Sequence, residues 1–341
     1  IVTMSPKKNS VWKLHFVLVV STLLCLAEFA LSQFSHSLTL LVDSYFLLYN
    51  IMTIIGTLLS SYLEQKQPTL RNTFGWARLA VLMMMISLLC LLALCFSVVV
   101  EALQTMVHAS HQDAMHHTIA VMGFAGANFL VHILCVILIG GFSRHQGEFM
   151  ILGQAGEEIL EGKYGLLNNP KQSRVKLRSL TILWVQDFIG CVFLLVTSLA
   201  VHFSSDDVGT FIDPILSIIY VFLLLGLTAR FAKEAAYILL QTLPEDVSVS
   251  QVKQNVTQKF PDIKKIHKFH LWRLAPSNFI CTAHIVVPSP EIYLSIHKSL
   301  LDYMKWDLGI ASVTIQPEFY DDVTSLNCSS CDDTSRCSSE S

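Results

Sequence analysis

The sequence predicts an all-α six-helix transmembrane bundle followed by a C-terminal cytosolic α+β domain. Hydrophobic residues make up 52% of the 341 residues and charged residues only 14%, and the mean hydropathy is +0.53. This composition is typical of a membrane protein. The second observation is a series of six apolar runs, each long enough to span a bilayer. The third is a change to soluble character after Lys233.

Composition and motifs also exclude several classes of function. The net charge of −3 does not favour a nucleic-acid partner. The sequence offers no nucleophile motif, phosphate-binding loop or cofactor motif, so neither an enzyme nor a resident cofactor is expected. The lipid bilayer is the partner that this composition indicates.

The six expected spans, read from the apolar runs, are residues 11–33, 36–62, 79–103, 117–141, 179–203 and 211–231. The first is expected to stay as an anchor helix, because no small-residue cleavage site precedes Gln33. Lys and Arg concentrate before the first run and after the second and fourth runs, whereas the opposite connections contain neither residue. The positive-inside rule therefore predicts that both termini lie in the cytosol.

Soluble segments after the last span predict a small two-layer domain at residues 241–320. "PEDVSVSQVKQNVTQKF" and "SPEIYLSIHKSLLDYMKWD" have helical periodicity, whereas "IKKIHKFHLWRL", "NFICTAHIVV" and "GIASVTIQPEF" have the pattern of strands. Their αββαβ order indicates helices packed on one sheet face, as in ferredoxin-like or metallochaperone-like domains. The remaining divisions are a cytosolic N-terminus at 1–10, the transmembrane domain at 11–240, and an acidic, serine-rich flexible tail at 321–341.

Several motifs recur in an order typical of a known family. In chain order they are "LVDS" in the second span, "NTFGWARLAVL" at 72–82, Glu101, Asn128, "DP" at Asp213–Pro214, and "FHLWRL", "CTAHI" and "TIQPEF" in the C-terminal domain. Together they resemble the cation diffusion facilitator family, and most of all the animal zinc exporters of the plasma membrane. The resemblance covers nearly the whole chain. It implies a dimer of six-span subunits that moves zinc out of the cytosol by alternating access, in exchange for protons.

The resemblance also implies a tetrahedral transport site. Two ligands four residues apart on the second span, His or Asp and then Asp, face a His-x-x-x-Asp pair on the fifth. This spacing places each pair on one helix face, and zinc favours four such donors. On this sequence the positions fall on Phe46 and Asn50, and on Leu183 and Asp187. Phenylalanine and leucine do not bind metal, and asparagine offers only a neutral carbonyl. Asp187 is therefore the one position that keeps a strong ligand. It is either a retained metal ligand or a buried acid that is satisfied by hydrogen bonds.

Neighbouring polar residues offer a substitute site. Asp43 lies one turn before Phe46. A site formed by Asp43, Asn50, Asp187 and Gln186 would contain only oxygen ligands and would suit Mn²⁺ or Mg²⁺ better than Zn²⁺. The alternative, which we favour, is that Asp43 is a packing aspartate that is hydrogen-bonded within the bundle.

The resemblance implies a second metal site in the C-terminal domain. Its matched positions are His270, His284 and Glu318, and a further family histidine falls on Ala311. The two histidines also fit an ordinary sheet. Cys328 and Cys331 resemble the C-terminal CxxC of some vesicular zinc transporters, and a flexible tail that binds no metal is the alternative.

Two functional hypotheses follow. The first is a component of a zinc or divalent-cation efflux system that transports by proton exchange, with zinc as the candidate ion. The second is a transport-defective member that acts as a heterodimer partner or regulatory subunit, because three of the four transport-site ligands are missing. Both hypotheses allow a homodimer or a heterodimer with a ligand-complete family member, and the resemblance favours the plasma membrane over intracellular vesicles.

Overall fold

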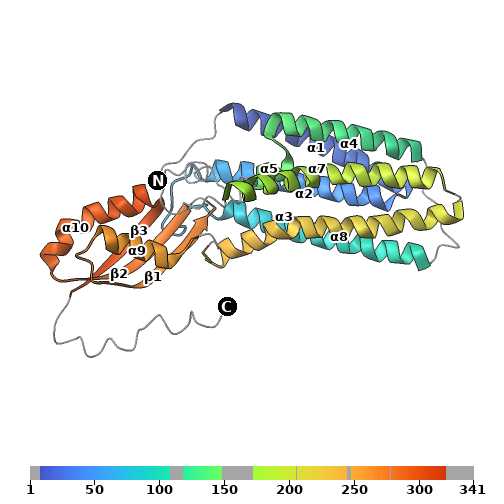
Figure 1. The fold of residues 1–341 in the computed structure, drawn as a ribbon. Coiled ribbons are helices and arrows are strands. Elements are labelled where there is room, and N and C mark those ends of the chain that lie inside the picture. The colour runs from blue at the N-terminus through green and yellow to red at the C-terminus, as the bar shows by residue number, and fades with distance from the viewer. Residues whose placement is uncertain are drawn as a thin grey trace. The chain divides into compact units, whose positions relative to one another are not determined.

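The structure is a computed structural model that describes residues 8–107, 118–147, 172–204, 206–243, 247–276 and 278–319 (Figure 1). The chain divides into two compact units. The described helices up to Leu239 belong to the first unit, and the described elements after Leu240 belong to the second.

The first unit confirms the predicted bundle. In the described part of the chain, six helices are long and apolar enough to cross a membrane. They are α1 (Lys8–Ser35), α2 (Leu38–Leu63), α3 (Leu79–Val107), α4 (Thr118–Ile139), α7 (Gln172–His202) and α8 (Asp206–Leu239). A short helix, α5 (Phe142–Gly147), follows α4, and the long helices run side by side (Figure 1). The protein is therefore an integral, multi-pass membrane protein.

Helix α2 is the most buried of the six spans. Within its most apolar window 78% of the residues are buried, compared with between 22% and 44% in the other five spans. It packs against α1, α3, α7 and α8. Because α2 is shielded from lipid, polar residues along it can be satisfied by neighbouring helices. This burial explains why an apolar run tolerates an aspartate and an asparagine.

Helix α8 continues to Leu239, past the apolar run that the sequence predicts to end near Phe231. Phe231, Ala235 and Ile238 are fully buried and belong to the main apolar cluster of the bundle. Their spacing of four and three residues places them on one helix face. The end of α8 is therefore amphipathic, with Lys233 exposed. A prediction based on a continuous apolar run places the end of this helix too early.

The N-terminus of α2 is capped by a side chain of α8. The backbone N–H groups of Leu38 and Thr39 donate to the Asp213 carboxylate at 2.6 and 3.1 Å, and the Thr39 hydroxyl donates at 2.5 Å. Asp213 is only 3% exposed, so these donors offset the cost of burying its charge. The carboxylate also lies at the positive end of the α2 dipole. This contact fixes the start of α2 against α8.

The second unit is a three-stranded sheet with helices, which confirms the predicted αββαβ order. Its elements are α9 (Val249–Lys259), β1 (Lys265–Ala275), β2 (Asn278–Val287), α10 (Pro290–Asp302), the π-helical turn η4 (Tyr303–Asp307) and β3 (Ile310–Phe319). The strand order is β1-β2-β3, with β1 antiparallel and β3 parallel to β2. The parallel pair requires the crossover that α10 and η4 provide.

The core of this unit lies between the helices and one face of the sheet. Val252 and Val256 of α9 and Leu300 of α10 share an apolar cluster with the odd-numbered residues of β2 from Phe279 to Val287. Side chains alternate along a strand, so the even-numbered residues of β2, among them His284, lie on the opposite face. That opposite face carries the polar side chains of the unit's candidate site.

Replacing Asp213 by alanine should destabilise the bundle, because four donors of Ser37, Leu38 and Thr39 at the start of α2 lose their acceptor. We expect the free energy of unfolding to fall by about 2–4 kcal/mol, measured by denaturant unfolding in detergent micelles. Glu101→Ala, at an exposed position of α3, is the matched control and should change stability by less than about 0.5 kcal/mol. Equal losses in the two variants would contradict the capping role.

Candidate functional site

The membrane site expected from the sequence lies on α2 and α7, and its first position is part of the packed core. Phe46 is 1% exposed and belongs to the apolar cluster of α2, α3 and α8. Its ring stacks on that of Tyr49, with 6.0 Å between centroids and 19° between planes. Phe46 therefore stabilises helix packing and contributes no ligand atom.

The second position, Asn50, is fully buried and hydrogen-bonded to α5. The Gln146 side-chain N–H donates to the Asn50 Oδ1 at 3.0 Å and to the Thr53 hydroxyl at 2.9 Å. The Gln146 Oε1 accepts a hydrogen bond of 2.9 Å from the Tyr49 hydroxyl. An N–H donor thus faces the oxygen that a metal would need, so the amide of Gln146 holds Asn50 in a structural network.

The α7 positions are Leu183 and Asp187, four residues apart on the same helix. The side chain of Leu183 lies outside the described residues. Asp187 is 1% exposed, and its Oδ1 accepts the backbone N–H of Ser143 at 3.0 Å. Gly141, at φ 101°, lies so close that an added Cβ would be 2.6 Å from the Asp187 Oδ2. The segment from Gly141 to Gln146 therefore contacts the site positions of both α2 and α7.

The oxygen atoms of the predicted substitute site have separate partners. The Asp43 Oδ1 accepts from the Tyr220 hydroxyl at 2.9 Å, and its Oδ2 accepts from the Asn128 amide. The Gln186 Oε1 accepts from the Arg230 guanidinium at 2.8 Å. Asp43 and Gln186 are thus each hydrogen-bonded to residues of other helices, and Asp43 has the hydrogen bonds expected of a packing aspartate.

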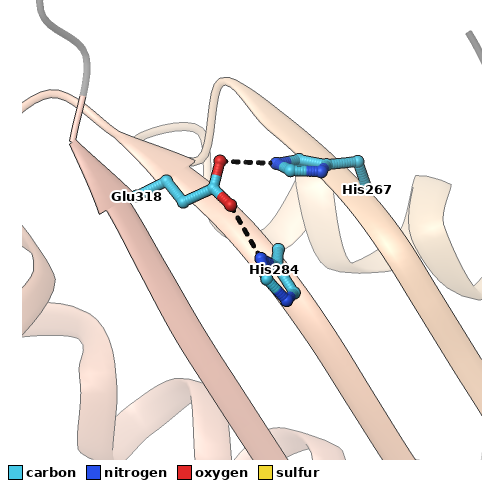
Figure 2. Close-up of side chains that lie close together, drawn as sticks. All are labelled: His267, His284 and Glu318. Atoms are coloured by element: carbon cyan, nitrogen blue, oxygen red, sulfur yellow. Dashed lines mark hydrogen bonds and ion pairs between the residues drawn. The ribbon is translucent and has the colours of Figure 1, made fainter. Parts of the chain in front are cut away.

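A compact group of potential metal ligands lies on the open sheet face of the second unit (Figure 2). The Glu318 Oε2 lies 2.8 Å from the His267 Nε2, and its Oε1 lies 2.7 Å from the His284 Nδ1. Among the residues that the structure describes, these are the one group of three or more His, Cys, Asp or Glu side chains whose ligand atoms all lie within 4.8 Å of one another. The glutamate therefore bridges two histidines from neighbouring strands.

The chemistry of this group suits zinc. Hydrogen bonds from His284 and then His267 hold the pKa of the Glu318 carboxyl below its usual range, so the carboxylate is charged near neutral pH. Two imidazole nitrogens and one carboxylate oxygen form a donor set that zinc accepts, with a fourth position left for water or another ligand. The three side chains are 17%, 22% and 36% exposed, so an ion can reach them from solvent.

Comparison with known proteins now identifies the family. The sequence profile of the cation efflux transmembrane domain matches residues 14–240, which is more than half of the chain. The chain belongs to the cation efflux, or cation diffusion facilitator, family. This result confirms the family expected from the motifs and places the protein among transporters rather than enzymes.

Distant relatives of this cation efflux protein extend over most of the chain. Proton-coupled zinc antiporter SLC30A1 of Homo sapiens is 22% identical, over 90% of this chain and 81% of the relative. Vacuolar zinc transporter ZRC1 of Saccharomyces cerevisiae is 23% identical, over 89% and 82%. Zinc transporter ZitB of Escherichia coli is 25% identical, over 92% and 89%. The likeness therefore includes both units of the structure.

The ligand group differs from the expected set at one histidine. His270 pairs with Thr282 and is exposed, whereas His267 pairs with His284 and reaches Glu318. Two residues of β1, Lys268 and Phe269, lie opposite the single residue Ala283 of β2 at this point, and Lys268 has a φ of 46°. This bulge is the physical reason why strand alternation did not single out His267. The structure brings His284 and Glu318 together and leaves His270 outside the group.

Other sequence expectations have different outcomes. Ala311 is exposed on β3 and supplies no ligand atom. Cys328 and Cys331 lie outside the described residues. Sequence reasoning missed the contacts that Gln146 and Arg230 make in the bundle. Both residues lie at or beyond the ends of apolar runs, where polar residues are common and do not indicate a buried contact.

Zinc binding at the sheet can be tested with one ligand and one neighbour. His267→Ala should lower the zinc affinity of the full chain at least about tenfold, because the group loses one of three ligands. His270→Ala, on the same strand but outside the group, should change the affinity less than about twofold. Competition with a chelating dye on detergent-purified protein measures both affinities. An equal loss of zinc affinity in the two variants would indicate that zinc binds at another site.

Proposed function

We propose that this chain is a component of a zinc-efflux system that does not carry the ion by itself and acts as a heterodimer partner or regulatory subunit. The observation that carries this proposal is the state of the membrane site. Donors from the protein already occupy one oxygen of each of its two remaining polar residues, with Gln146 on the Asn50 Oδ1 and the Ser143 backbone on the Asp187 Oδ1. A zinc ion that bound these two oxygens would have to displace both donors.

The coordination chemistry supports the same conclusion. Zinc loses its hydration shell on entering a closed site, and four donors normally offset that loss. Of the four family positions only Asp187 retains a charged ligand, while Phe46 is part of the apolar core. The competing hypothesis of an altered ligand set needs Asp43 and Gln186 to turn towards Asn50. Each of the two already has a partner on another helix.

The relatives indicate the system to which the subunit belongs. The three that we compared are named as zinc transporters or antiporters, and the human one is named as proton-coupled. We therefore assign zinc efflux in exchange for protons to the assembly of this chain with a ligand-complete family member. The group of His267, His284 and Glu318 gives the subunit its own contact with zinc.

The sequence also supports a proposal for the orientation of the chain and for its membrane. Basic residues concentrate in the connections on one side of the bundle, so we propose that both termini and the second unit are cytosolic. The resemblance to animal plasma-membrane exporters favours the plasma membrane. Protease protection of tagged termini and surface biotinylation in animal cells test these two assignments.

A flux measurement tests whether the chain transports alone. Proteoliposomes that contain only this protein should take up zinc no faster than protein-free vesicles, because the site lacks a closed set of ligands. Zinc transporter ZitB, reconstituted in the same way, is the positive control. Zinc uptake by the unmodified chain at a rate near that of the control would overturn the proposal.

Partnership has a separate readout. Tagged protein purified from animal membranes under mild detergent should bring down a second cation efflux protein, one with all four transport-site ligands, in a near-equal amount. Quantitative mass spectrometry measures the ratio of the two chains. A preparation that contains only homodimers would contradict the partner role, whatever the flux result.

A further inference from the structure

The chain changes direction directly after α4. This helix ends at Ile139, and the next two residues, Gly140 and Gly141, have φ values of 83° and 101°. A residue with a Cβ rarely adopts these conformations, so the two glycines permit the turn. The residues that follow form α5, which packs against α4 and α7.

The side chain of Gln146 joins α5 to α2. It is buried, and its Oε1 accepts from the Tyr49 hydroxyl at 2.9 Å. Its Nε2 donates to the Asn50 Oδ1 at 3.0 Å and to the Thr53 hydroxyl at 2.9 Å. A buried amide is costly unless its polar atoms have partners, so these three bonds fix the place of Gln146 on α2.

Two further contacts join the same segment to other helices. The backbone N–H of Ser143 donates to the Asp187 Oδ1 of α7 at 3.0 Å. Phe142 is buried in an apolar cluster with residues of α1, α2 and α4, among them Cys135. Residues 140–147 thus connect the site positions of α2 and α7. A motion that separated α2 from α7 here, or that admitted water, would break buried hydrogen bonds.

We propose that residues 140–147 form a strap that closes the degenerate membrane site against water at the end of the bundle where α4 ends. This is the end that we propose to be cytosolic. The inference rests on the proposed function and deepens it. A carrier must open at this end to load its ion, whereas a subunit that does not carry zinc can stay closed.

Two native cysteines report on the strap. Cys135 is buried in the same cluster as Phe142, and its carbonyl accepts the backbone N–H of Gly141 at 3.3 Å. Displacement of the strap would uncover this thiol to a charged maleimide, which does not enter lipid. Cys95 is buried in the apolar cluster of α2, α3 and α8, so it reports unfolding of the bundle instead.

The test labels the full chain in lipid nanodiscs, which leave both faces of the bilayer open to the reagent. Mass spectrometry measures the labelling rate of each cysteine. Gln146→Ala removes three hydrogen bonds of the strap, so it should speed the labelling of Cys135 about tenfold or more. The matched control is Gln65→Ala, at an exposed position after α2, and it should change the rate less than about twofold.

A second variant displaces the strap without altering Gln146. In Gly141→Ala the new Cβ would lie 2.6 Å from the Asp187 Oδ2, on a backbone that alanine rarely adopts. It should speed the labelling of Cys135 about fivefold or more. Gly126→Ala on α4, where a Cβ meets nothing within 4 Å, is its control and should leave the rate unchanged.

Two results would overturn the inference. One is unchanged labelling of Cys135 in either strap variant. The other is labelling of Cys95 together with Cys135, which would show that these contacts hold the whole bundle together and do not close one end of it. The labelling uses no zinc, so its outcome is independent of the zinc flux that decides the proposed function.

Discussion

The architecture depends on one buried carboxylate. Asp43 lies on the most buried span, is 1% exposed, and accepts hydrogen bonds from Asn128 of α4 and Tyr220 of α8. An unpaired charge inside a bilayer is costly, so these donors cannot be withdrawn without loss of stability. Three helices are thereby held around a single side chain. Gly190 lets α7 approach the same place, because a Cβ there would lie 2.6 Å from the Tyr220 hydroxyl.

The same constraint applies to the positions that match the family's transport site. A carrier must keep acceptor atoms free for its ion and tolerate the cost of that exposure inside the membrane. Here three oxygen atoms accept hydrogen bonds from within the protein: the Asn50 Oδ1 from Gln146, the Asp187 Oδ1 from the Ser143 backbone, and the Gln186 Oε1 from Arg230. Each of these hydrogen bonds joins two helices. Together they help to hold the bundle together at the positions that match the family's transport site.

Sequence reasoning reached the parts of the structure that periodic patterns determine. The spans follow from hydropathy, and the αββαβ order follows from helical and strand alternation, so both were predictable. His284 and Glu318 were found because they match the family's motifs, and the regular pairing of β2 with β3 places them on one sheet face. His267 was missed because the bulge at Lys268 changes the register of β1, which no alternating pattern reveals. Gln146 and Arg230 were missed because their partners are more than forty residues away in the chain.

The two candidate metal sites differ in what it costs to keep them without an ion. The sheet group is partly exposed, so water and the hydrogen bonds within the group satisfy its donors at little cost. The membrane positions are not in contact with water. Polar side chains there must therefore either bind an ion or form hydrogen bonds within the protein. A chain that does not carry zinc, as we propose for this one, is therefore stabilised by internal partners at its membrane positions, whereas its exposed sheet group has no such requirement. Hydrogen-bonded membrane positions beside an assembled surface group are therefore what we expect of the subunit proposed above, which would contact zinc without transporting it.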